Sequence, residues 1–79
     1  MINETEQERQ EQIQDSIEET QEQIENIQLV VQKLNILKDT TTDRDVKSDV
    51  NSLIEKYKND ITYLEDIKES DENTLQILI

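Results

Sequence analysis

Apolar side chains recur at alternating steps of four and three residues through the first half of the chain. The series begins at Ile13, ends at Leu34 and contains one polar member, Thr20. Because an α-helix turns once every 3.6 residues, this spacing places the series on one side of a helix. The pattern predicts a helix from about Thr5 to Lys38, whose stripe suits either an ordinary amphipathic core or a coiled-coil seam. The members of the stripe are Ile13, Ile17, Thr20, Ile24, Ile27, Val31 and Leu34.

A second apolar stripe follows the polar stretch DTTTDRD, residues 39–45. Three consecutive threonines disfavour a helix because their branched side chains restrict the rotamers that a helix allows. Thr42 followed by Asp45 fits a capping box with Asp in place of Glu. We therefore expect a turn near residues 39–43 and a second helix from near Asp43 to about Glu69. The members of its stripe are Val46, Val50, Leu53, Ile54, Tyr57, Ile61, Leu64 and Ile67.

The short connection predicts that the two helices lie antiparallel as a hairpin. Folding the chain about Thr41 and Thr42 brings Leu34 opposite Val50 and Thr20 opposite Leu64, so the two stripes match. The chain contains no Gly and no Pro, the residues that favour the tight turns of β-hairpins. The predicted fold class is thus all-α: one antiparallel, coiled-coil-like helical hairpin spanning residues 13–69.

The two ends of the chain are less regular than the hairpin. Residues 1–12 are polar and acidic after Ile2 and form an arm that is either a solvated helical extension or disordered. Residues 70–79 form an apolar tail. Ser70 or Asp71 can cap a short third helix there, the tail can fold back, or the second helix can continue. The sequence leaves these alternatives open.

Several large apolar residues have no partner within the predicted hairpin. Leu29 and Ile36 share the position opposite the first stripe, and Tyr63 lies beside the second stripe. Burying one large aliphatic side chain stabilises a protein by roughly 1.5–3 kcal/mol, which favours a further packing partner. That partner is a second copy, completing a helical bundle, or a different protein. The predicted protein interface comprises Leu29, Val30, Ile36, Leu37, Tyr63, Leu75, Ile77, Leu78 and Ile79.

Charge narrows the choice of partners. The net charge is −12; residues 1–32 contain nine acidic residues and one basic residue, whereas residues 33–58 contain six basic and five acidic residues. Nucleic-acid phosphates and anionic membranes repel such a chain, so neither is an expected direct partner. No apolar run approaches the ~20 residues of a membrane span, and we expect a cytoplasmic protein or a component of a larger assembly such as a virion. Four glutamates form the predicted acidic surface, either a solubilising helix face or a site for a basic partner: Glu18, Glu19, Glu22 and Glu25.

The residue types present exclude most catalytic chemistry. The chain has no His and no Cys, so it lacks a nucleophile–base pair and the usual zinc ligands, and no glycine-rich loop can hold a phosphate. Asp43, Asp45 and Asp49 have the spacing of calcium-loop ligands, but Ser48 and Ile54 stand where such a loop needs Gly and Glu. We expect no enzyme activity, no cofactor and no metal site.

These observations predict a structural or assembly protein that works through helical contacts. Gly, Ala and Pro are absent while Ile, Asn, Lys and Glu are frequent, which suggests an AT-rich coding genome such as that of a low-GC bacterium or its phage. A small scaffold, core or adaptor of a phage or bacterial complex fits these features. The alternative is an acidic antagonist that imitates nucleic acid or inhibits a regulatory protein.

Overall fold

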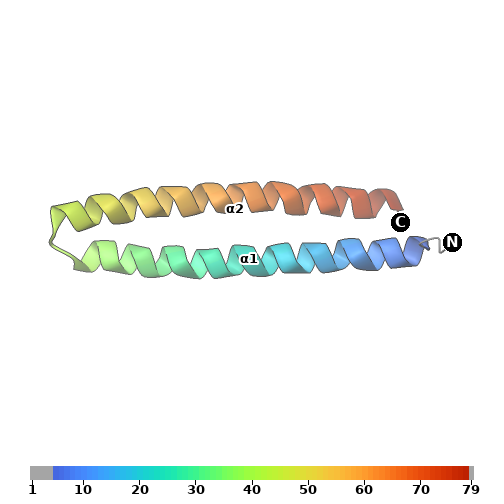
Figure 1. The fold of residues 1–79 in the computed structure, drawn as a ribbon, viewed down its shortest axis with the longest axis horizontal. Coiled ribbons are helices and arrows are strands. Elements are labelled where there is room, and N and C mark those ends of the chain that lie inside the picture. Colours follow the sequence, from blue (N-terminus) through green and yellow to red (C-terminus); the bar gives the residue numbers. More distant parts are fainter. Residues whose placement is uncertain (1–4, 79) are drawn as a thin grey trace.

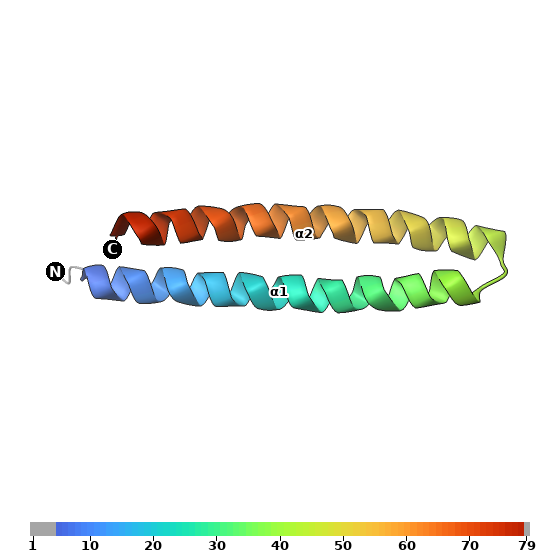
Figure 2. The same cartoon turned by 180° about the vertical axis from the view of Figure 1, so that it is seen from behind.

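Two long antiparallel helices form the whole of the described structure. The computed structural model describes residues 5–78, in which α1 spans Glu6–Thr40 and α2 spans Arg44–Leu78, each with 35 residues. The helices lie side by side along their full length, and both ends of the chain lie opposite the loop (Figure 1; Figure 2, from behind). Between residues 5 and 78 the chain has no strand. The predicted all-α helical hairpin is confirmed.

The first helix begins earlier than its apolar stripe. The Thr5 hydroxyl oxygen accepts a hydrogen bond from the Glu8 backbone N–H at 3.1 Å and so caps the helix. Glu6 and Glu8 lie in the first turn, where carboxylates stabilise the positive end of the helix dipole. Residues 6–12 of the predicted arm are therefore helical, the first of its two alternatives. Residues 1–4 lie outside the described part of the chain.

The chain reverses over residues 41–43, within the range predicted for the turn. Asp43 Oδ1 accepts hydrogen bonds from the backbone N–H groups of Asp45 at 2.9 Å and Val46 at 3.2 Å. These donors are the second and third residues of α2, so Asp43 is its N-cap. The predicted capping box from Thr42 to Asp45 is wrong, because the Asp43 carboxylate takes both free donors.

The second helix does not stop at Glu69. It continues through Ser70 and Asp71 to Leu78, so the described residues contain no third helix and the sequence's alternative of a continuous helix is the one adopted. The reason is visible in the spacing after Leu64: Lys68, Asp71, Leu75 and Leu78 follow at steps of four and three residues. The stripe continues through two charged residues, and no Gly or Pro ends the helix.

The core of the hairpin is a narrow strip between the helices. Its buried members come from both predicted stripes, and the Thr20 hydroxyl donates a hydrogen bond to the Ser16 carbonyl at 2.9 Å. The rest of both stripes is half-buried, apart from Leu53, which is exposed. Two helices share only one contact surface, so each leaves most of its circumference open. The buried residues are Ile17, Thr20 and Ile24 of α1 and Val50 and Ile54 of α2.

Candidate protein interface

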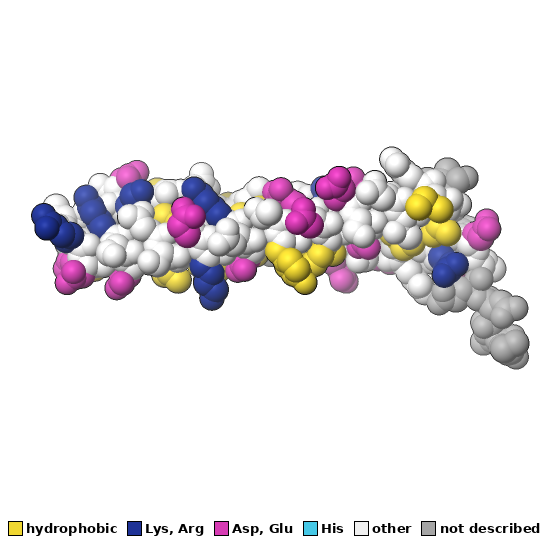
Figure 3. Space-filling model, turned by 90° about the horizontal axis from the view of Figure 1, so that it is seen from above, with side chains coloured by type: hydrophobic (Ala, Val, Ile, Leu, Met, Phe, Trp, Pro, Cys, Tyr) yellow, Lys and Arg dark blue, Asp and Glu magenta, His cyan; other side chains and the backbone are white. Residues whose placement is uncertain are grey.

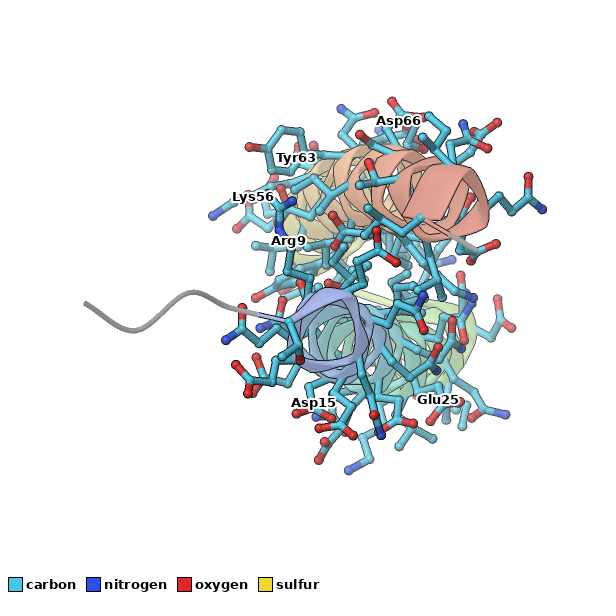
Figure 4. All side chains as sticks on the ribbon, turned by 90° about the vertical axis from the view of Figure 1, so that its right-hand side faces the viewer. Arg9, Asp15, Glu25, Lys56, Tyr63 and Asp66 are labelled. Atoms are coloured by element: carbon cyan, nitrogen blue, oxygen red, sulfur yellow. The ribbon has the colours of Figure 1, made fainter. Side chains whose placement is uncertain are left out.

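The hairpin has two flanks, one on each side of the plane that contains both helices. Seen end-on, Arg9 of α1 and Lys56 and Tyr63 of α2 lie on one flank, and Glu25 lies on the other (Figure 4). Asp15 and Asp66 point outward, away from the opposite helix (Figure 4). Residues seven positions apart lie on the same side of a helix in such a pair. Each labelled residue therefore identifies the side of the helix on which the residues seven, fourteen or more positions away from it lie.

The first flank carries most of the exposed apolar side chains. Val30 and Leu37 lie three and four heptads after Arg9, and Ile77 lies two heptads after Tyr63. Tyr63 is 67% exposed and Ile77 is 85% exposed. Leu53, one helical turn before Lys56, belongs to the same side and is also exposed. In the space-filling view from above α2, apolar side chains reach the lower edge, where this flank lies (Figure 3).

Charges on this first flank cancel. Lys33 lies between Val30 and Leu37 in the helix, and its charge adds to those of Arg9 and Lys56. Three acidic residues oppose these three basic residues, so the flank has no net charge, and we call it the neutral flank. The acidic three are Glu19, two heptads before Lys33; Asp49, one heptad before Lys56; and Asp60, one turn after Lys56.

The second flank is polar and strongly negative. Gln21 Nε2 donates a hydrogen bond to Glu25 Oε1 at 3.2 Å, and a groove between the helices brings Gln21 together with Glu65, Glu69 and Glu72 of α2. The exposed large apolar residues of the described chain fall elsewhere. Counting along the heptads gives eight acidic residues and two basic residues, Arg44 and Lys58, on this acidic flank. The acidic residues are Glu11, Glu18, Glu25, Asp39, Glu55, Glu65, Glu69 and Glu72.

The structure divides the predicted interface among three places. Val30, Leu37, Tyr63 and Ile77 lie on the neutral flank. Leu29 and Ile36 follow Asp15 by two and three heptads and therefore lie on the outer face of α1, which points away from α2. Both side chains are more than half exposed, at 54% and 59%.

The apolar tail is divided as well. Leu75 and Leu78 are half-buried on the side of α2 that faces α1. The Gln10 side-chain amide donates a hydrogen bond to the Leu78 carbonyl at 3.2 Å, and Leu75 shares a groove with Gln10 and Gln14. Ile79 lies outside the described residues. Within the tail, Ile77 is therefore the described residue most available to a partner.

The four glutamates of the predicted acidic surface do not form one surface. Glu18 and Glu25 lie on the acidic flank, where Gln14 Nε2 approaches Glu18 Oε1 at 3.5 Å. Glu22, one heptad after Asp15, lies on the outer face of α1, and Glu19 lies on the neutral flank. The acidic surface that the fold builds instead combines Glu18 and Glu25 with carboxylates of α2.

A polar cluster spans the two helices near the open end. The Ser16 hydroxyl donates to Asp71 Oδ2 at 2.9 Å, and Lys68 Nζ donates to Gln21 Oε1 at 2.7 Å. Lys68 also pairs with Glu72 at 3.7 Å. Sequence reasoning did not predict this cluster because it followed apolar residues alone and left open whether the second helix continues past Glu69. The signal was the continued spacing of the stripe through two charged positions.

These cross-helix pairs join residues three to five positions beyond those expected from a fold about Thr41 and Thr42. Side chains on a helix lean toward its N-terminus. In an antiparallel pair they therefore lean toward each other, and a residue meets one that lies further along the second helix. The helices are also shifted along their axes, since α2 begins beyond the end of α1 at the loop and α1 extends further at the open end (Figure 1).

Comparisons with known proteins add no family assignment. No protein-family model, no curated protein and no solved structure matches the chain. Between residues 5 and 78, neither helix offers a stretch apolar enough to cross a bilayer. The same residues contain no group of three acidic side chains arranged to hold a metal ion. The two flanks and the outer face of α1 are the features on which a function must be argued.

Proposed function

We propose that this chain is a non-enzymatic structural or assembly protein that acts through helical contacts with other proteins. The observation that carries the proposal is the exposure of Leu29 and Ile36 on one outer face of α1, at 54% and 59%. The neutral flank supplies a second exposed apolar surface. A role as a small scaffold, core or adaptor of a phage or bacterial complex accords with these two surfaces.

The physical support is that a two-helix hairpin has only one internal contact surface. The apolar stripe of α1 already packs against α2. Apolar residues on the opposite side of α1 are therefore not buried when the hairpin folds. Packing them against a further helix removes them from water and extends the hairpin into a helical bundle. An isolated hairpin with so few buried side chains gains stability from the same contact.

A photo-crosslinking amino acid at position 29 or 36 tests the proposal in the cells that make the protein. We expect covalent adducts of higher mass from both positions. The matched control carries the same amino acid at Asn59, which lies one heptad before Asp66 on the outer face of α2. No adducts above the Asn59 background would contradict a function based on protein contacts.

The acidic flank supports a second candidate function, an antagonist of a basic protein. Glu65, Glu69 and Glu72 line one groove with Gln21 and Lys68, next to Glu25, and Lys68 pairs with Glu72 at 3.7 Å. A negative surface of this kind attracts sites that normally bind nucleic-acid phosphates. Binding to poly-L-lysine, measured over a salt series, tests whether the flank acts as a unit: its neutralisation must weaken binding more than an equal neutralisation of the outer faces.

A further inference from the structure

We infer that the neutral flank is the contact surface for a second copy of this chain, so that two hairpins pack flank to flank into a two-fold symmetric four-helix bundle. The inference rests on the proposed function and names one partner for it. The outer face of α1, with Leu29 and Ile36, remains open in such a bundle. It stays available for a different protein.

Charge identifies the occupant. Two copies that each carry a net charge of −12 repel one another unless the surfaces that meet are uncharged. The acidic flank, with eight acidic residues against Arg44 and Lys58, cannot face its own copy without strong repulsion. A basic partner, in contrast, would bind the acidic flank. The neutral flank combines zero net charge with exposed apolar side chains, and its own copy has the same two properties.

Flank-to-flank packing also keeps the excess negative charge apart. The acidic flanks lie on the two outer sides of the bundle, separated by both layers of helices. At physiological ionic strength charges interact over a Debye length of about 8 Å, shorter than the thickness of two helices. The two acidic flanks therefore do not meet.

Absolute mass from light scattering tests the dimer on the full chain. We expect twice the monomer mass of 9.4 kDa, and 9.4 kDa for the double variant Val30→Glu with Leu53→Glu. Both positions are about 40% exposed, so circular dichroism should show unchanged helix content. The matched control adds the same two charges to the acidic flank, through Asn35→Glu with Asn51→Glu, and should remain dimeric.

Two results would overturn the inference: a 9.4-kDa wild-type chain at millimolar concentration, or a dimer that survives the flank variant. Neither would remove adducts formed in cells from positions 29 and 36. Failure of the dimer is thus distinguishable from failure of the proposed function.

Discussion

The two flanks of the hairpin are made by the same two helices, yet they differ in both charge and apolar content. The neutral flank balances three basic against three acidic residues and exposes Tyr63 and Ile77, whereas the acidic flank has eight carboxylates and two basic residues, Arg44 and Lys58. Both helices contribute to both flanks. The difference therefore comes from heptad position, not from the composition of either helix. The net charge of −12 belongs to the whole chain and does not describe the charge of either flank.

Making the neutral flank resemble the acidic one should have the largest effect. Lys33→Glu with Lys56→Glu changes that flank by four charges without removing an apolar side chain. Like charges brought together across an interface cost several kcal/mol, so we expect the dissociation constant of the dimer to rise by roughly a hundredfold or more. Analytical ultracentrifugation at 150 mM and 1 M salt measures the change.

The matched control for this charge change leaves the neutral flank intact. Lys58→Glu with Asn35→Glu and Asn51→Glu also lowers the net charge by four, on the acidic flank. We expect that variant to remain dimeric, and we expect salt to restore part of the affinity of the neutral-flank variant, because the Debye length falls to about 3 Å at 1 M. Equal dissociation of both variants would show that net charge alone governs assembly.

The polar cluster of the seam sharpens the comparison of the flanks because it joins the helices that both flanks share. Asp71→Ala removes the acceptor of the Ser16 hydroxyl, which lies 2.9 Å away in a half-buried position. Loss of one such bond should lower the free energy of unfolding by about 1–2 kcal/mol. Urea unfolding measures it. Asp66→Ala on the outer face is the control, expected within about 0.5 kcal/mol of the parent.

The helices were predictable because their evidence is local. Spacing alone identified Ile17, Ile24, Val50 and Ile54 as core residues, and all four are buried. The run of Thr residues located the turn. The end of α2 was left open because the stripe passes through Lys68 and Asp71. A search for apolar residues at helical spacing does not recognise charged residues as members of a stripe.

The arrangement of the candidate interface was less predictable, because it depends on both helices at once. Each residue turns the direction of the side chain by about 100°. Glu18 and Glu25 therefore fall on one flank, while Glu19 and Glu22 fall on other sides of α1. Sequence reasoning grouped the four by their closeness in the chain. Only the position of α2 separates one flank of α1 from the other.

The cap of α2 supports both flanks equally, since it fixes the start of the second helix. Asp43→Ala removes the acceptor for the N–H groups of Asp45 and Val46, which should cost about 1 kcal/mol of stability. Thr42→Ala is the control and should change little, because the capping box predicted for it does not form. Thermal unfolding of the two variants compares them. A larger loss of stability for Thr42→Ala than for Asp43→Ala would show that Thr42 is the N-cap of α2.

The smallest change in stability is expected on the acidic flank. Glu18→Gln with Glu25→Gln replaces two exposed carboxylates whose partners are the Gln14 and Gln21 side chains, and a glutamine oxygen can still accept those hydrogen bonds. The free energy of unfolding should stay within about 0.5 kcal/mol of the parent. The dimer should persist as well, since neither residue belongs to the neutral flank.

Binding of the Glu18→Gln, Glu25→Gln variant to poly-L-lysine tests the antagonist function. If the acidic flank attracts basic proteins as one surface, affinity for poly-L-lysine should fall and its salt dependence should become shallower. Asp15→Asn with Asp66→Asn removes the same two charges from the outer faces, where the carboxylates point away from each other. A fall confined to the flank variant favours the antagonist function. Equal falls in both variants would mean that poly-L-lysine responds to total charge, leaving the neutral flank and the outer face of α1 as the surfaces that carry specificity.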